Sequence, residues 1–150
     1  MTTTHILHSH IRYTADFDAS TVKATKCNCT YDQKRNFVIL RLENFESDFK
    51  LLSPDSKDKV ATYAPETEAT KNGIGEIQRY FCSTCGVHVW VQGWYKANGQ
   101  TFDPASLNLA TIDQPQEGID LSQVKIQYVD LLHNNPLGAP QSEPYPGGLI

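Results

Sequence analysis

The chain has 150 residues, of which 39% are hydrophobic and 20% charged, with a formal net charge of -4 at pH 7. This composition is ordinary for a soluble globular protein, and the length suits one domain whose core needs no disulfides. The acidic balance argues against nucleic acid or an anionic membrane as a partner. Because the sequence shows neither a signal peptide nor an apolar segment of about 20 residues, we expect a cytoplasmic protein with reduced cysteines.

Short alternating segments dominate the chain, which predicts a mainly β fold of antiparallel strands. In chain order they lie at residues 11–17, 37–42, 49–52, 60–63, 76–81, 87–91, 107–112 and 124–129. Turn signals separate them, including Asn98-Gly99, a step that favours tight turns. A short helix is expected at residues 103–106, where Asp103 could cap the first turn. Residues 1–133 then form a single β domain, and residues 134–150 an extended tail rich in Pro and Gly.

The four cysteines lie in two close pairs, Cys27-x-Cys29 and Cys82-x-x-Cys85. A C-x-x-C in a tight turn directs two thiolates to one point, which suits tetrahedral zinc. The same spacing occurs in redox motifs, but the chain after Cys85 alternates like a strand instead of beginning a helix. The alternative is buried free thiols that act as small hydrophobic side chains. We therefore predict that residues 1–133 form a zinc-binding domain.

Four motifs follow one another along the chain, at residues 8–13 (HSHIRY), 27–32 (CNCTYD), 81–86 (FCSTCG) and 108–113 (NLATID). In this order they resemble the glutathione-dependent formaldehyde-activating enzyme family, which includes the centromere protein V-like proteins. The resemblance covers about residues 8–130, and the four motifs together are specific although each alone is weak. It implies a zinc-containing β-tent of antiparallel strands. It also implies a carbon-sulfur lyase that adds or removes a glutathione thiol at an electrophilic carbon.

The first departure from the family pattern concerns its structural zinc. In the family, an early C-x-C and the later C-x-x-C hold this ion. Here, with a small shift in register, His8 and His10 take the places of the early cysteines. Because imidazole can replace thiolate on zinc, Cys82, Cys85, His8 and His10 could form a site of two thiolates and two imidazoles. Alternatively, the two histidines simply share one face of an edge strand.

The second departure is Asp32, which stands where the family's reactive C-x-C-x-x-C motif has its third cysteine. Cys27, Cys29 and Asp32 could still bind zinc, although less tightly than three thiolates would. A solvated turn residue is the commoner role for an aspartate. A third arrangement places both cysteine pairs around one purely structural zinc. With the reactive motif altered, we expect weak or absent activity on glutathione and formaldehyde.

His88 is the candidate general acid or base, because an unperturbed histidine titrates near neutral pH. It would act beside Cys27 and Cys29, the other candidate catalytic residues, if its face of the strand lines a cavity. Structural hydrogen bonding is the commoner role for such a histidine.

The remaining candidates would contact a ligand. Aromatic side chains could wall a pocket, and basic side chains could hold carboxylates such as those of glutathione. The aromatic candidates are Trp90, Trp94 and Tyr95, and the basic ones are Arg12, Lys34 and Arg35. Of these, Arg12 and Trp90 are the predicted cosubstrate-binding residues. The commoner role of an aromatic residue in a strand is core packing, and an isolated basic residue is usually solvated.

Two classes of function remain open at this point. The first is a divergent carbon-sulfur lyase acting on a small or medium electrophile, with zinc and with glutathione as the expected cosubstrate. A variant of this class is a zinc-free acid/base enzyme that dehydrates, isomerises or cyclises its substrate on the same scaffold. The second class is a non-catalytic, zinc-stabilised module that binds a partner. A homo-oligomer is compatible with either class.

Overall fold

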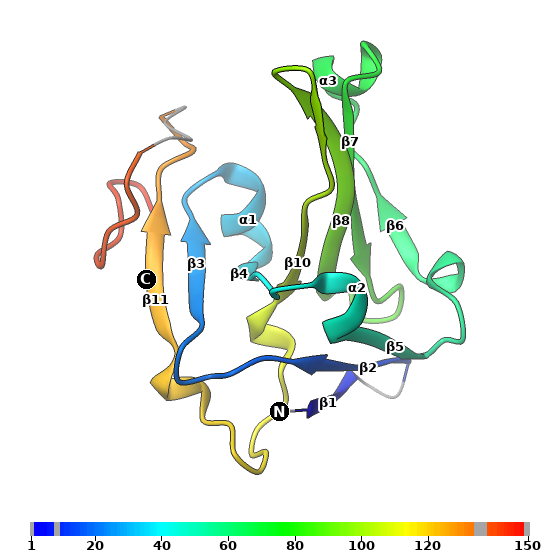
Figure 1. The fold of residues 1–150 in the computed structure, drawn as a ribbon, viewed down its shortest axis with the longest axis vertical. Helices are drawn as coiled ribbons and strands as arrows, with labels where there is room; N and C mark the ends of the chain where they lie inside the picture. Colours follow the sequence, from blue (N-terminus) through cyan, green and yellow to red (C-terminus); the bar gives the residue numbers. More distant parts are fainter. Residues whose placement is uncertain (1, 8–9, 134–137, 149–150) are drawn as a thin grey trace.

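The computed structural model describes residues 2–7, 10–133 and 138–148, and its strands form two sheets (Figure 1). The smaller sheet has three antiparallel strands in the order β1-β2-β5. They are β1 (Thr2–Leu7), β2 (Ile11–Asp16) and β5 (Phe49–Ser53). The predicted mainly β, largely antiparallel fold is confirmed.

The larger sheet has eight strands among the described residues, in the order β11-β3-β4-β10-β8-β7-β6, with β9 paired to β8. These are β3 (Lys23–Cys27), β4 (Val38–Leu40), β6 (Ala61–Tyr63), β7 (Gly75–Phe81), β8 (His88–Ala97), β9 (Gln100–Phe102), β10 (Ala105–Asn108) and β11 (Lys125–Val129). Its pairs are antiparallel except β11 with β3, which run in the same direction. This parallel pair sets Val129 beside Cys27, so the ends of both strands meet at the first cysteine pair.

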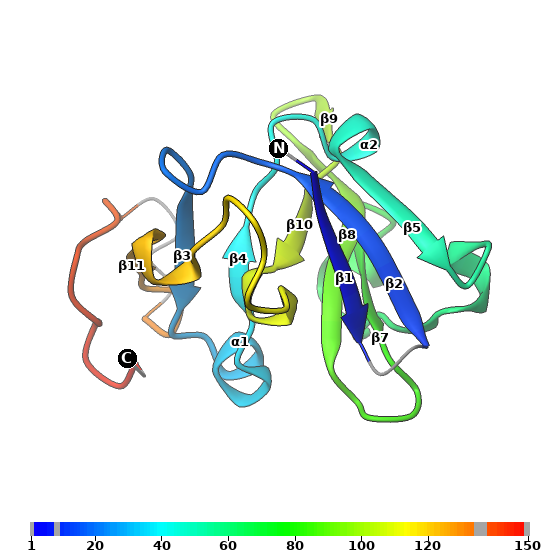
Figure 2. The same ribbon diagram turned by 90° about the horizontal axis from the view of Figure 1, so that it is seen from below.

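The core lies between the two sheets, where β1 and β2 cross over β7 and β8 (Figure 2). Aromatic rings join the layers: the ring centroid of Trp90, in β8, lies 5.2 Å from that of Phe49, in β5. Within the larger sheet, Trp90 also stacks on Tyr80, with ring centroids 4.3 Å apart. Tyr13 of β2 also contacts Phe49, with ring centroids 5.4 Å apart. Trp90 is only 1% exposed, so its ring is a core residue. Trp90 also borders a hollow that Phe45, Phe49 and Gln92 line, and its predicted role in binding a cosubstrate stays a prediction.

Short helices connect the strands. They are α1 (Thr30–Arg35), α2 (Phe45–Asp48) and α3 (Glu68–Lys71), with 3-10 turns at η1 (Lys57–Lys59), η2 (Leu109–Thr111) and η3 (Leu121–Gln123). None of the helices in the described ranges has the length and apolar character needed to cross a membrane. The helix expected at residues 103–106 is wrong, because β10 begins at Ala105. The strand expected at residues 107–112 ends early, because the Asn108 side chain accepts the Ala110 N–H and caps η2.

The described part of the C-terminal tail runs beside β11 (Figure 1). Two hydrogen bonds join Gln141 to Tyr128: each backbone N–H donates to the other residue's carbonyl, at 2.9 and 3.1 Å. Further along the tail, Tyr145 donates from its hydroxyl to the carbonyl of Ala139 at 2.9 Å. The tail is thereby held close to the ends of β3 and β11.

Candidate metal centre

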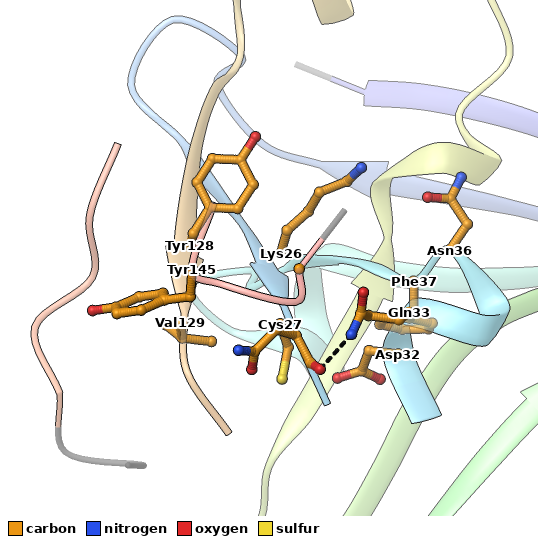
Figure 3. Close-up of a pocket in the computed structure, with 11 residues that line it drawn as sticks. Lys26, Cys27, Asp32, Gln33, Asn36, Phe37, Tyr128, Val129 and Tyr145 are labelled. Atoms are coloured by element: carbon orange, nitrogen blue, oxygen red, sulfur yellow. Dashed lines mark hydrogen bonds between the residues drawn. The ribbon is translucent and has the colours of Figure 1, made fainter. Parts of the chain in front are cut away.

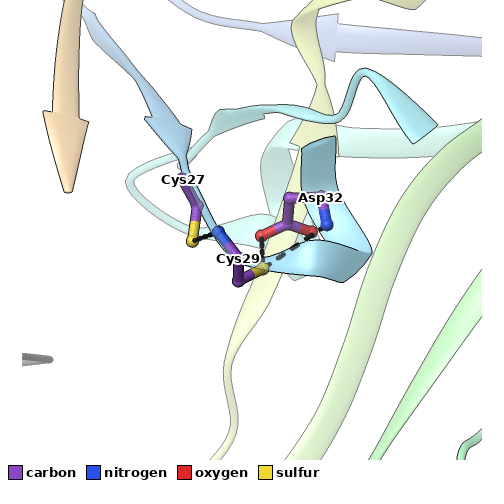
Figure 4. Close-up of side chains that lie close together, drawn as sticks. All are labelled: Cys27, Cys29 and Asp32. Carbon is purple, nitrogen blue, oxygen red and sulfur yellow. Dashed lines mark hydrogen bonds between the residues drawn. The ribbon is translucent and has the colours of Figure 1, made fainter. Parts of the chain in front are cut away.

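Three predicted ligands, Cys27, Cys29 and Asp32, come together where β3 leads into α1 (Figure 4). Their two sulfurs and a carboxylate oxygen lie within 4.8 Å of one another, and theirs is the one such group found in the described ranges. In tetrahedral zinc, with bonds of about 2.3 Å to sulfur, two sulfurs lie about 3.8 Å apart. Shifts of about 1 Å or less would bring these atoms to that separation. The group could therefore hold a metal ion.

Local hydrogen bonds orient the three side chains. The backbone N–H of Cys29 donates to the Cys27 sulfur at 3.3 Å, which the C-x-C spacing permits. Cys29 is the N-cap of α1: its sulfur accepts the Asp32 N–H at 3.4 Å, and its thiol donates to Asp32 Oδ2 at 3.2 Å. This exchange resembles a capping box, in which the N-cap and the third helical residue bond each other. Asp32 is therefore half-buried in a helix, and the solvated-turn alternative is wrong.

The two thiols of this group have different acidities. A hydrogen bond between them lowers the pKa of Cys29 and raises that of Cys27, and burial raises the pKa of Cys27 further. Burial also raises the pKa of Asp32, against the opposing hydrogen bonds of the thiols and the charges of Arg79 and Arg35. Of the two thiols, Cys29 therefore loses its proton first. Because metal binding needs thiolates, affinity at this group should increase with pH.

A narrow pocket adjoins the group (Figure 3). Cys27 and Asp32 form part of its wall, and Tyr145 and Gly148 of the tail form another part. The remaining wall residues are Lys26, Asn28, Gln33, Asn36, Phe37, Tyr128 and Val129. The cavity volume is about 20 Å³, close to the space that one water molecule needs. With the tail in place, only the slender end of a larger molecule could reach Cys27.

Asn28, between the two cysteines, holds this loop to the end of β11. Its side chain is 3% exposed and donates from Nδ2 to Asp130 Oδ1 at 2.6 Å. Its Oδ1 accepts the backbone N–H groups of Leu131 and Leu132 at 2.8 and 2.9 Å. Asp130 also accepts from the His133 ring at 2.8 Å, and the bond from Asn28 is the main reason that the pKa of Asp130 is lowered. The sequence analysis missed this network, since no spacing signal links residue 28 to residue 130.

Another side of α1 contacts His88 at the start of β8. The Arg35 side chain donates from Nε to His88 Nε2 at 3.0 Å, and the Tyr31 hydroxyl lies 3.5 Å from His88 Nδ1. Burial, aided by the charges of Arg35 and Arg79, lowers the pKa of His88 to about 4. His88 is thus neutral at neutral pH, with one ring nitrogen already engaged. These contacts fit the hydrogen-bonding role, and the role of His88 as a general acid or base stays a prediction.

The second cysteine pair lies in the turn between β7 and β8. Burial would raise the pKa of Cys82, but backbone N–H groups of Cys85 and Thr84 donate to its sulfur and the net shift is downward. Gly86, with φ of 75°, donates its N–H to the Cys82 carbonyl at 2.7 Å and closes the turn. No third described ligand joins this pair, so the arrangement of all four cysteines around one ion is not formed.

Two histidines, His8 and His10, were predicted to bind zinc together with this pair of cysteines. His10 is an exposed turn residue and does not form a ligand group with Cys82 and Cys85. His8 lies outside the described residues, so its predicted ligand role stays a prediction.

The remaining predicted ligand contacts lie on three different elements. Arg12 is an exposed residue of β2, paired with Ser53, while Lys34 and Arg35 belong to α1. Trp94 and Tyr95 lie further along β8 than Trp90. Both line a separate hollow that also includes Arg79.

No known family model, curated protein or solved structure matches the chain. The resemblance to the formaldehyde-activating family therefore stays a prediction, and the function of the site has to be inferred from its own residues.

Proposed function

We propose that Cys27, Cys29 and Asp32 bind one zinc ion and that the protein is a carbon-sulfur lyase or a related enzyme working at this centre. The observation that carries the proposal is the close approach of the three ligand atoms at the wall of a pocket. Two thiolates and a carboxylate form a donor set that suits zinc. Three protein ligands leave one tetrahedral position open, as catalytic zinc sites require.

The chain's own residues would prepare the centre in several ways. Zinc held here would act as a Lewis acid and would lower the pKa of a neighbouring thiol or water. Of the two thiols, Cys29 ionises before Cys27 as pH rises, and Asp32 supplies a carboxylate oxygen. Asn28 keeps the loop in place through β11, so the ligand positions are set before an ion arrives. In a reducing cytoplasm, both thiols would stay available.

The pocket limits what could react. Its volume of about 20 Å³ admits a group about the size of a water molecule. We therefore infer that a small electrophilic carbon, or the slender end of a larger substrate, approaches Cys27, with a thiol such as glutathione as the adding or leaving group. The carboxylate of Asp32 replaces a thiolate of the family motif. Because of this replacement, we expect a lower affinity for zinc and weak activity on glutathione and formaldehyde.

Metal analysis of untagged protein tests the metal assignment. Cys29→Ser should lose zinc, and Asp32→Asn should release it more readily to a chelator than the unaltered protein does. Cys85→Ser is the matched control, because it removes one thiol from the other pair. Loss of a second, separate zinc in Cys85→Ser would fit the predicted site at Cys82 and Cys85. Zinc content unchanged in Cys29→Ser would refute the proposed centre.

The reaction is tested separately, by following S-hydroxymethylglutathione formation. Asp32→Cys restores the family motif and should bind zinc more tightly and turn over faster than the unaltered protein. Robust turnover by the unaltered protein would instead show that a carboxylate is a competent third ligand. Absence of turnover in both proteins, with zinc bound, would count against the formaldehyde reaction and leave the metal assignment standing.

A further inference from the structure

A second, more open hollow lies between the end of α1 and the turn that leads into β8. Its volume is about 520 Å³, which is large enough for a small organic molecule. Lys34, Arg35, Cys85, Gly86, Val87 and His88 line it. Two of these side chains are cationic and none is acidic. The hollow is therefore a basic groove, separate from the pocket beside Cys27.

Arg35 is held in a defined position inside this groove. Its guanidinium carbon lies 3.8 Å from the centroid of the Tyr31 ring, and its Nε donates to His88 Nε2 at 3.0 Å. His88 is itself stacked on Phe81, with ring centroids 5.3 Å apart. These contacts use one face and one N–H of the guanidinium. Within the described part of the chain, the terminal nitrogens of Arg35 have no hydrogen-bond acceptor.

The arginines on the Tyr31 ring form no ion pair with a carboxylate in the described part of the chain. Arg79 also lies on the Tyr31 ring, 4.2 Å from its centroid, and its buried Nε has no acceptor among the described residues. None of the ion pairs in the described ranges includes Lys34, Arg35 or Arg79. The nearby Asp32 carboxylate accepts a hydrogen bond from the Cys29 thiol instead of pairing with an arginine. Arg79 does donate from Nη1 to the carbonyl of Ile77, and Arg35 to His88, but neither has an anionic partner among the described residues. Partly buried cations without a counter-charge are costly, and a bound anion would offset that cost.

We propose that this groove binds a small organic anion, whose carboxylate or phosphate group is held by the terminal N–H groups of Arg35. The planar guanidinium can offer two parallel hydrogen bonds to either oxyanion. Lys34 adds a second positive charge at the exposed rim, and Val87 and Cys85 face the uncharged part of the ligand. The inference does not depend on zinc, because the groove and the Cys27 pocket lie along different sides of α1.

The test is a titration followed by NMR, with the Arg35 Nε–H signal as the local readout. Succinate probes a carboxylate ligand, inorganic phosphate probes a phosphate ligand, and succinamide is the neutral control. We expect a saturable shift with one of the two anions and none with succinamide. A response to succinate alone would assign a carboxylate ligand, and a response to phosphate alone a phosphate ligand. No saturable response to either anion, or an equal response to succinamide, would overturn the proposal.

Two variants that each remove one positive charge distinguish anion binding in the groove from anion binding to the general surface. Arg35→Gln should weaken anion binding about tenfold or more, whereas Lys125→Gln, on the exposed side of β11, should leave it unchanged. Equal weakening by both variants would refute a specific site. If Arg35→Gln does not fold, the titration of the Arg35 Nε–H signal in the unaltered protein still shows whether the groove binds an anion. Anion binding that vanishes after zinc removal by a chelator would place the anion on the metal and would also overturn the proposal.

Discussion

The hydrogen bonds of Asn28 give the sharpest test of how the cysteine loop is held. Asn28→Ala removes the acceptor for two backbone N–H groups, those of Leu131 and Leu132. At about 1 kcal/mol for each hydrogen bond, the free energy of unfolding should fall by about 2 kcal/mol from these two bonds alone. Urea denaturation followed by circular dichroism measures the loss. Zinc content should fall as well, because Cys27 and Cys29 flank the residue.

Asn28→Asp isolates the third bond of this side chain. The new carboxylate still accepts the two backbone N–H groups, but it faces Asp130, whose Oδ1 lies 2.6 Å from the present Nδ2. Two carboxylates so close share a proton, so the pKa of the pair in the folded state rises above its unfolded value of about 4. The variant should therefore be least stable near neutral pH and recover relative to Asn28→Ala as pH falls towards about 4. A pH-independent difference between the two variants would refute this reasoning, as would an Asn28→Ala protein as stable as the unaltered one.

The remaining predictions concern strand packing, a buried hydroxyl and thiol acidity. Gly93→Ala should destabilise the fold by about 1–3 kcal/mol or more in urea unfolding, because the added Cβ would overlap the backbone of β7; an unchanged midpoint would contradict this. Tyr13→Phe should cost about 1 kcal/mol, since the buried Tyr13 hydroxyl bonds Thr111 Oγ1 at 2.7 Å, and a cost near zero would show that this bond adds nothing. In chelator-treated protein, iodoacetamide should label Cys29 at lower pH than Cys27, because their shared hydrogen bond lowers the pKa of the first thiol and raises that of the second. Mass spectrometry over a pH series measures both rates, and the reverse order would be inconsistent with this assignment.

Features that depend on near neighbours in the chain could be predicted from the sequence. Alternation at residues 76–81 and 124–129 marked β7 and β11, since side-chain direction in a strand has a period of two residues. Asn98-Gly99 marked the hairpin between β8 and β9, where both residues take positive φ. The group of Cys27, Cys29 and Asp32 was suggested by the family resemblance, in which Asp32 takes the place of a third cysteine, and its hydrogen bonds run between near neighbours in the chain.

Features that depend on contacts between distant segments were decided only by the tertiary structure. Helix α1 has no apolar periodicity to mark it; it forms because Cys29 caps one end and Asn36, with φ of 48°, closes the other. The bond from Asn28 to Asp130 spans 102 residues, and that from Arg35 to His88 spans 53. Sequence spacing carries no information about such pairs, because strand order and sheet packing determine which residues meet. The resemblance in the sequence could thus suggest the metal ligands. The hydrogen bonds of Asn28 that hold the cysteine loop, and the basic groove near Arg35, depend on how the sheets fold.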